Sequence, residues 1–145
     1  MMKNKCICFV NSAKSWGGGE KWHYEIATAL NKEGYKTIAI TYPKSQLSSR
    51  FIEEKIKTYQ IKISNLSFLN PLKIIKVWKI LTKENVSTLI INLPSDLKLI
   101  SPIAKIAGVI KTIYRRGSAI PINNTILNRL IFKRSIDQII ANSEA

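Results

Sequence analysis

Residues 5–41 read KCICFVNSAKSWGGGEKWHYEIATALNKEGYKTIAIT, and this stretch decides the expected fold. A short apolar run ends at Ser12, three consecutive glycines follow, and a helical pattern then continues to Gly34 before a second apolar run begins. Runs that are apolar throughout are typical of strands buried on both faces of a parallel sheet. Glycine is the usual residue at the end of a helix. The stretch therefore predicts a strand, a glycine loop, a helix and a second strand.

The same alternation of apolar runs and helical patterns continues along the chain. Strands are expected within residues 5–12, 36–43, 60–68, 87–93, 109–115 and 136–143. Helices are expected over residues 19–34, 48–59, 70–85, 96–108 and 123–135. Ser48 or Ser49 is expected to cap the second helix, and Asn70 followed by Pro71 is a strong start signal for the third. The fold class is therefore α/β, with a doubly wound, Rossmann-like parallel sheet of about six strands and helices on both faces.

The charge of the chain is strongly positive and unevenly distributed. The 145 residues carry a net charge of +14. Between Lys55 and Arg134 the only carboxylates are Glu84 and Asp96. Such a field attracts nucleic acid, anionic lipid headgroups or phosphorylated ligands. A genome rich in lysine, isoleucine and asparagine codons would produce the same excess without any ligand, so both explanations stay open.

Several other classes of site and segment are not indicated. Cys6 and Cys8 lie two apart in a strand, so their side chains share a face and cannot bridge each other. His23 is the only histidine, which leaves too few ligands for a metal site, and it lies at the border of an apolar arc, as a packed side chain does. No apolar run is long enough for a membrane span or a signal peptide. We expect reduced thiols, no metal, no cofactor and a cytoplasmic location.

The glycines at 17–19 stand where backbone N–H groups and a helix N-terminus attract anions. A P-loop would need Gly-Lys-Ser/Thr, but Gly19 is followed by Glu20 and Lys21. A dinucleotide fingerprint would need glycine where Trp22 stands and an acidic residue after the second strand, which is missing. A plain flexible turn also tolerates glycines. Contact with a phosphate is the favoured interpretation because three glycines occur together at a strand-to-helix switch.

The stretch from Lys14 to Ile40 resembles the N-terminal hallmark of family-4 glycosyltransferases of the GT-B fold. That hallmark is two glycines, a small residue, a glutamate and a basic residue, on a helix that a glycine ends before the second strand. The matching residues are Gly17, Gly18, Gly19, Glu20, Lys21, Gly34 and Tyr35. The resemblance implies that the glycine loop faces the phosphates of a sugar nucleotide.

The resemblance continues from Asn92 to Ala145 and is similar there to a bacterial subset of the family. In that subset an aspartate with a lysine or arginine follows the fourth strand, and Arg-Arg-Gly follows the fifth, as Asp96 and Arg115–Gly117 do here. Many family members have a histidine after the fifth strand, so its role cannot be carried over to this chain. The resemblance implies that residues 1–145 form a single N-terminal, acceptor-side domain, and that the C-terminal donor-binding domain is not in this sequence.

From these matches we expect Gly17, Gly18, Gly19 and Lys21 to bind the donor phosphates. We expect Arg115, Arg116 and Gly117 to bind the acceptor, and Asp96 and Arg116 to act in catalysis. Each assignment has a simpler alternative. The arginines would be ordinary solvated side chains, Asp96 would be a helix N-cap, and Glu20 would be a first-turn carboxylate favoured by the helix dipole.

The helix expected over residues 70–85 is basic and amphipathic. Lys73, Lys76, Lys79 and Lys83 group on one side of the helical wheel, and Ile74, Ile75, Trp78 and Leu81 group on the other. The favoured interpretation is a helix that packs its apolar side on the sheet and leaves its lysines in solvent. The alternative is a surface that rests on anionic lipid at the inner face of the membrane.

The expected function is that of the N-terminal domain of a glycosyltransferase. As the resemblance implies, the whole enzyme would transfer a sugar from a nucleotide-diphosphate donor to a cell-envelope glycan or lipid-linked acceptor, with retention of configuration and without a metal. The isolated domain is expected to be inactive. One alternative is a one-domain subunit that binds acceptor or membrane and needs a catalytic partner. Another is a nucleic-acid-binding protein, although no helix-turn-helix, RRM or zinc motif is present.

Overall fold

The computed structural model describes residues 6–64, 66–116 and 138–141, and within them it contains six strands. Five lie where they were expected, whereas the third lies at Lys57–Gln60 and not within residues 60–68. The elements are β1 (Cys6–Asn11), α1 (Gly18–Lys32), β2 (Lys36–Thr41), α2 (Gln46–Glu53), β3 (Lys57–Gln60), the 3-10 helix η2 (Ser67–Leu69), α3 (Pro71–Lys83), β4 (Val86–Ile91), α4 (Pro94–Ala107), β5 (Lys111–Arg116) and β6 (Gln138–Ala141). The helix predicted over residues 123–135 lies outside the described residues.

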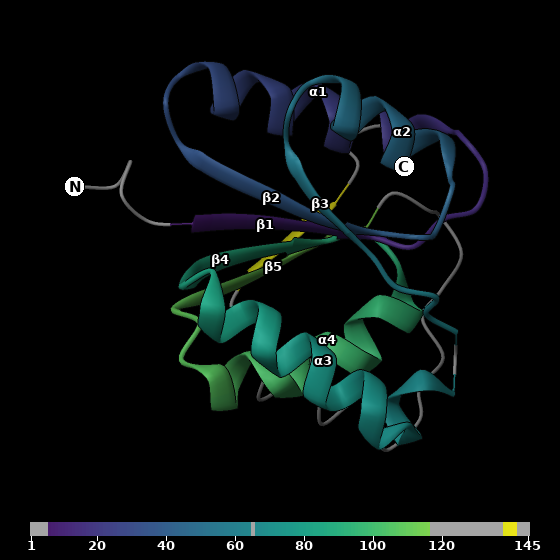
Figure 1. The fold of residues 1–145 in the computed structure, drawn as a ribbon, viewed down its shortest axis with the longest axis vertical. Coiled ribbons are helices and arrows are strands. Elements are labelled where there is room, and N and C mark those ends of the chain that lie inside the picture. Colours follow the sequence, from purple (N-terminus) through teal and green to yellow (C-terminus); the bar gives the residue numbers. More distant parts are fainter. Residues whose placement is uncertain (1–5, 65, 117–137, 142–145) are drawn as a thin grey trace.

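The six strands form one sheet in the order β3-β2-β1-β4-β5-β6. Every neighbouring pair is parallel. Helices α1 and α2 cover one face of the sheet, and α3 and α4 cover the other (Figure 1). The prediction of a doubly wound α/β fold is confirmed. The strand order reverses between β1 and β4, and sheets of this kind bind ligands at the carboxyl ends of the strands beside such a reversal.

Strand β1 supplies apolar side chains to both layers because successive side chains point to opposite faces. Cys6, Cys8 and Val10 belong to the core beneath α3 and α4, whereas Phe9 belongs to the core beneath α1 and α2. Both cysteines are free thiols, as expected. Burial raises the pKa of Cys6 to about 11, so this thiol stays protonated and serves as a small apolar group.

The second helix, expected over residues 48–59, lies at Gln46–Glu53. Helix α2 begins three residues after Pro43, and its cap is Ser45, whose hydroxyl accepts a hydrogen bond from the Ser48 N–H at 3.1 Å. The expected caps Ser48 and Ser49 are therefore wrong. The helix ends at Glu53 because Lys55 adopts a left-handed conformation with φ of 62°. Residues 57–60, expected to be helical or at a strand margin, instead pair with β2 as strand β3.

The other helix signals agree better with the structure. The side chain of Asn70 accepts hydrogen bonds from the N–H groups of Leu72 and Lys73, and Pro71 is the first helical residue, so this start is confirmed. Gly34 follows α1 with φ of 96°, a conformation that suits glycine. Helix α4 begins earlier than expected, because Pro94 takes the first helical position and Leu93 the cap position. The interpretation of Asp96 as the N-cap is therefore wrong.

Glu84 is a buried carboxylate that joins three elements at the amino end of the sheet. It lies between α3 and β4 and forms ion pairs with Lys36 at 3.2 Å and Lys57 at 2.6 Å, residues that begin β2 and β3. It also accepts a hydrogen bond from the Tyr59 hydroxyl. Burial raises the pKa of Glu84, but the hydrogen bonds from Lys57, Tyr59 and Lys36 outweigh it and lower the pKa to about 2. The carboxylate is thus held ionised.

Helix α3 buries a narrower face than its sequence suggested. Val77, Ile80 and Leu81 are buried against the sheet, whereas Ile75 and Trp78 are exposed. The predicted division into a packed apolar side and a solvated lysine side is therefore only partly correct. The buried stripe is shifted around the helix, and two large apolar side chains remain in solvent beside the lysines.

Candidate functional site

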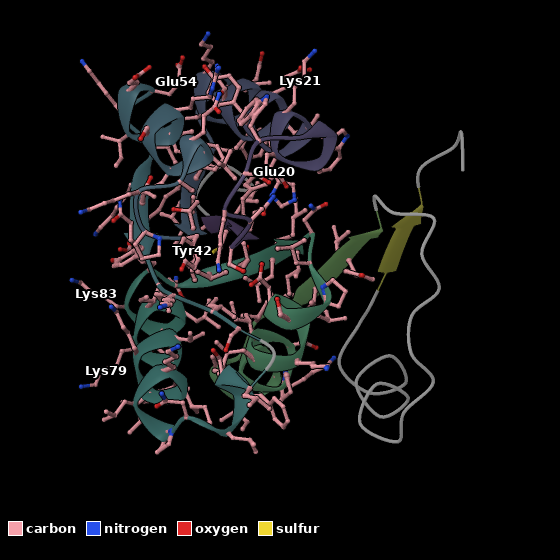
Figure 2. The ribbon with its side chains drawn as sticks, turned by 90° about the vertical axis from the view of Figure 1, so that its right-hand side faces the viewer. Glu20, Lys21, Tyr42, Glu54, Lys79 and Lys83 are labelled. Carbon is pink, nitrogen blue, oxygen red and sulfur yellow. The ribbon has the colours of Figure 1, made fainter. Side chains whose placement is uncertain are left out.

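The candidate site lies where the sheet reverses its strand order, at the carboxyl ends of β1 and β4. Asn11 is the last residue of β1, Asn92 follows β4, and the N-terminus of α1 meets them through Glu20. All three side chains are buried. In Figure 2 the Glu20 side chain is directed inward, toward this edge of the sheet. The first helix is thereby fixed to the strands on either side of the reversal.

The contacts of Glu20 form a small polar network. Its carboxylate accepts a hydrogen bond from Asn11 Nδ2 at 3.0 Å and a longer one from Asn92 Nδ2 at 3.5 Å. The Asn11 side chain also accepts a hydrogen bond from the Ala13 N–H at 3.0 Å, which orders the loop after β1. Glu20 is therefore more than the first-turn carboxylate of the simpler interpretation. It helps to hold the loop in one conformation.

The three glycines play different structural roles. Gly17 is the N-cap of α1 in an extended conformation, with φ of −155°. A Cβ added at Gly18 would have no neighbouring heavy atom within 4 Å, whereas a Cβ at Gly19 would lie 2.5 Å from Asn92 Nδ2. Gly19 is thus required by packing against Asn92. Gly18 has no such requirement within the described structure, and its Cα faces open space.

The N-terminus of α1 presents donors that are suited to an anion. The first hydrogen bond within the helix runs from the Lys21 N–H to the Gly17 carbonyl at 3.0 Å. The N–H groups of Gly18, Gly19 and Glu20 therefore have no partner inside the helix, and the helix dipole adds a partial positive charge there. Since the Gly18 side is open, a phosphate can approach these groups closely.

Lys21, the fourth residue expected to bind phosphate, lies on the outer side of α1. Its side chain is 66% exposed and pairs with Glu25, one turn further along, at 3.9 Å. Figure 2 shows it directed away from the Glu20 side of the helix. A role for Lys21 in phosphate binding stays a prediction, and it would require the side chain to leave Glu25 and reorient.

Asp96 lies in the first turn of α4 and contacts the end of β1. Its carboxylate is fully buried and accepts hydrogen bonds from the Ser12 N–H at 2.9 Å and the Ser12 hydroxyl at 2.5 Å. Burial raises the pKa of Asp96 to about 6, although both hydrogen bonds from Ser12 act in the opposite direction. Asp96 thereby positions the chain that leads into the glycine loop. A general-base role for it stays a prediction.

Arg115 and Arg116 end β5 at the same edge of the sheet. In the register of the sheet Ile91 pairs with Tyr114, so Asn92 and Arg115 follow at the same level of the two neighbouring strands. The backbone of both arginines also pairs with β6. Both arginines therefore lie at the carboxyl edge of the sheet, and their role in acceptor binding stays a prediction. Gly117 lies outside the described residues.

A wall of aromatic and basic side chains beside the glycine loop was not predicted from the sequence. The Arg50 guanidinium lies over the rings of Trp16 at 4.4 Å and Tyr24 at 5.8 Å from the ring centroids, so α2 contacts the loop. The Lys14 ammonium lies 5.3 Å from the centre of the Tyr42 ring, at the end of β2. Ring faces combined with cations can bind sugars and phosphates.

His23 is buried as predicted, whereas the site residues Asn11 and Asn92 were not predicted. His23 is fully buried, with its ring 5.4 Å from that of Phe9 and 5.6 Å from that of Trp22, so the prediction of a packed histidine is confirmed. Asn11 and Asn92 were not predicted as site residues. A signal was present for both, because each is the first polar residue after an apolar run that ends at the ligand-binding edge.

Structural comparison finds the same fold in larger proteins. No protein-family model matches the sequence, and no curated protein matches it with significance. Solved structures do match. Anabaena HepE in complex with UDP and glucose superposes with a TM-score of 0.75 at 18% identity, over 97% of this chain and 39% of HepE. Acinetobacter baumannii MurG has a TM-score of 0.70 at 15% identity, over 94% of this chain and 41% of MurG.

A third match is a glycosyltransferase from Rickettsia africae, with a TM-score of 0.66 at 20% identity, over 94% of this chain and 42% of that protein. This chain therefore spans about two-fifths of the length of the structures it matches. These neighbours are glycosyltransferases of the GT-B type. The described part of the chain has the fold of one half of a GT-B glycosyltransferase, as the resemblance in its sequence predicted.

Proposed function

We propose that this chain is the acceptor-side half of a glycosyltransferase that uses a nucleotide-diphosphate sugar as donor. The observation that carries the proposal is the start of α1, where an open Gly18 and three N–H groups without helical partners lie at the strand reversal. The likeness in fold to HepE, solved with UDP and with UDP-glucose, supports it.

In this proposal the glycine loop stabilises the departing nucleoside diphosphate. Negative charge grows on the diphosphate as the glycosidic bond breaks, and fixed N–H donors at a helix N-terminus stabilise such charge without reorganising. The loop is held in place by the hydrogen bonds that Asn11 and Asn92 donate to Glu20. We assign no metal ion to this step. Transfer that stops with a chelator and resumes on adding Mg²⁺ would contradict that assignment.

The acceptor would lie over the carboxyl ends of β4 and β5. We assign its binding to Arg115, Arg116 and Gly117, because an arginine fork binds carboxylate or phosphate in bidentate fashion. Arg116 would also stabilise charge during transfer. Asp96 would hold Ser12 in position through the hydrogen bond from the Ser12 hydroxyl. If that hydrogen bond opens, Asp96 would instead accept the proton of the acceptor hydroxyl. The wall formed by Trp16 and Arg50 would flank the sugar rings.

A complete active site needs a second, donor-binding half in addition to residues 1–145, supplied by the same polypeptide or by a partner. We propose that the acceptor is a cell-envelope glycan or its lipid-linked precursor, that the anomeric configuration is retained, and that the enzyme works at the cytoplasmic face of the membrane. None of the helices in the described ranges is long and apolar enough to span a membrane.

The proposal is tested by the protein expressed from its intact gene, with any partner that co-purifies. Turnover of a panel of nucleotide sugars is measured with lipid extracts as acceptor, beside Arg116→Ala. Consumption of one donor, with loss of transfer but retention of donor binding in Arg116→Ala, supports the assignment. Full transfer by Arg116→Ala would contradict the acceptor site.

A further inference from the structure

We propose that the acceptor carries an anionic group, a carboxylate or a phosphate, which basic and aromatic side chains beside the glycine loop bind. This set of side chains, called the basic wall below, consists of Lys14, Trp16, Tyr24, Tyr42 and Arg50. The inference rests on the proposed function, because it takes the ligand of the wall to be the acceptor of a glycosyltransferase. It adds to that function a class of acceptor, namely an acidic glycan.

The basic wall lies at the carboxyl edge of the sheet, on the β2 side of the glycine loop. Lys14 and Trp16 belong to the segment that joins β1 to α1, and Trp16 directly precedes Gly17, the N-cap of that helix. Tyr42 directly follows β2, and Arg50 lies on α2. Helices α1 and α2 cover the same face of the sheet (Figure 1). The wall therefore adjoins the place where the donor phosphates are proposed to bind.

Each cation of the basic wall is held against an aromatic ring. The Arg50 guanidinium lies 4.4 Å from the centroid of the Trp16 ring and 5.8 Å from that of Tyr24. The Lys14 ammonium lies 5.3 Å from the centroid of the Tyr42 ring. A cation over a ring face is attracted to the ring and keeps its charge. Both positive groups are thus positioned in advance, which lowers the entropic cost of binding an anion.

Tyr24 anchors the basic wall to the rest of the domain. Its hydroxyl donates a hydrogen bond to the Glu54 carboxylate at 2.8 Å. Its ring centroid lies 6.2 Å from that of Trp16 and 6.2 Å from that of Phe51, which is fully buried. The wall is therefore tied to the core beneath α1 and α2 and presents one fixed surface to a ligand.

No carboxylate forms an ion pair with the cations of the basic wall within the described residues. The ion pairs found there involve Lys21, Lys36 and Lys57, and neither Lys14 nor Arg50 takes part in one. Lys14 is exposed and Arg50 is half-buried, so both charges can be reached by a ligand. An ammonium and a guanidinium at one surface attract and hydrogen-bond carboxylates and phosphates.

Arg50 is oriented by one contact and keeps donors for another. The side-chain oxygen of Gln46, in the amide orientation that satisfies both of its polar ends, accepts hydrogen bonds from Arg50 Nη2 at 3.0 Å and Nε at 3.3 Å. A guanidinium has five N–H donors, so this contact uses two and leaves three without a partner among the described residues. The remaining donors, one on Nη2 and two on Nη1, suit the two oxygens of a carboxylate or phosphate.

The position of the basic wall favours an acceptor longer than one sugar ring. In the sheet, β2 and β5 are separated by β1 and β4. The ends of β2 and β5 therefore lie three strand spacings apart, or roughly 14 Å. The wall flanks the end of β2, and the arginines proposed to bind the acceptor end β5. An acidic oligosaccharide can reach both ends, with its sugar rings against the aromatic side chains and its anionic group on the cations.

The first test measures protection of Lys14 from acetylation in the protein expressed from its intact gene, with any partner that co-purifies and without donor. The probes are glucuronic acid, glucose 1-phosphate and the neutral methyl glucoside, and acetylation is read by peptide mass spectrometry. We expect one or both acids to protect Lys14, and methyl glucoside to be at least about tenfold less effective. Lys32, exposed in the last turn of α1, is the internal control and should be acetylated equally throughout.

The pattern of protection decides the inference without any catalysis. Protection by glucuronic acid alone identifies a carboxylate as the recognised group, and protection by glucose 1-phosphate alone identifies a phosphate. Equal protection by methyl glucoside would overturn the inference, because the wall would then recognise sugar rings rather than charge. Absence of protection by both acids, or protection by UDP as strong as by either acid, would overturn it as well.

A second test distinguishes binding of the anion from a structural role of Arg50. Transfer is measured with an acidic acceptor and with its neutral form, in which the carboxyl group is reduced or the phosphate removed. We expect Lys14→Gln and Arg50→Gln each to raise KM for the acidic acceptor about tenfold, with little change in kcat and in KM for the neutral form. Arg50→Lys should restore part of the loss, and Lys32→Gln is the matched control.

The two variants keep this test decisive if one of them folds poorly, because Lys14→Gln leaves α2 unchanged. An equal rise in KM for the acidic and neutral acceptors in both variants would show a purely structural wall and overturn the inference. Absence of transfer from every donor would contradict the proposed function instead, and the protection of Lys14 would still show whether the wall binds an anionic sugar.

Discussion

Gly19 of α1 faces the side chain of Asn92 so closely that a Cβ at position 19 would lie 2.5 Å from Asn92 Nδ2. The neighbouring Gly18 has no such contact, since a Cβ there would have no heavy atom within 4 Å. Two adjacent glycines of one loop are therefore constrained differently. Gly19 allows the helix to approach the strand after the sheet reversal, whereas Gly18 leaves room on the side where a ligand would bind.

This difference predicts opposite effects of the same substitution. Gly19→Ala must displace the Asn92 amide from Glu20, so we expect the free energy of unfolding to fall by about 1–3 kcal/mol. Gly18→Ala should leave it unchanged or raise it slightly, because alanine favours a helix more than glycine. Urea denaturation measures both. Equal stability of the two variants would show that the protein accommodates a Cβ beside Asn92 without loss of stability.

The buried carboxyl of Asp96 predicts a pH dependence of stability. Burial raises its pKa from 3.8 to about 6, so between these values the folded state binds a proton that the unfolded state has lost. The contribution of Asp96 to stability therefore declines as the pH rises from about 4 to about 6, by on the order of 3 kcal/mol. Asp96→Asn removes this titration.

The check is urea unfolding of both proteins across that pH range. We expect the stability of the parent relative to Asp96→Asn to decrease with rising pH and to level off above about pH 6. Parallel stability curves for the two proteins would show that burial does not raise the pKa of Asp96. Ser12→Ala provides a control, since it removes one of the two hydrogen bonds to the carboxylate while leaving the carboxyl itself.

The ion-paired carboxylate of Glu84 predicts a pH dependence of stability that is opposite in sign to that of Asp96. Its pKa is lowered from 4.5 to about 2 in the folded protein, so its contribution is fully present above about pH 4.5 and is lost as the pH falls toward 2. Glu84→Gln should cost about 2–3 kcal/mol at neutral pH, because Lys36 and Lys57 lose their shared partner. The difference between parent and variant should shrink at pH 3. An unchanged difference at pH 3 would contradict the pKa shift.

The sequence predicted the fold well because its periodic signals are strong. Apolar runs and helical patterns gave the strand and helix order, and Asn70, Pro71 and Gly34 each mark an element end where a specific backbone group needs a cap or a left-handed conformation. The second helix was less predictable. Its cap is Ser45, and its end depends on the left-handed Lys55, for which the sequence carries no glycine or proline signal.

The candidate site was only partly predictable from sequence. The glycine loop and the arginines carry recognisable motifs, and the edge that holds them follows from strand order. The contact of Glu20 with Asn11 and Asn92 depends on how α1 docks across two strands that are far apart in sequence. Asp96 was expected to act in catalysis, with a helix N-cap as the simpler alternative, and neither expectation indicated that its carboxylate accepts hydrogen bonds from Ser12, 84 residues earlier. Such long-range pairings leave no local signature.

The most direct test of the central claim is donor turnover by the protein from its intact gene, compared with its Gly18→Val variant. We predict that one nucleotide-diphosphate sugar is consumed by the parent, and that Gly18→Val lowers this rate by about a hundredfold or more with no change in melting temperature. The variant fills the space through which a phosphate would reach the helix N-terminus. Equal rates in parent and variant, or no sugar nucleotide turned over or bound by the parent, would contradict the account.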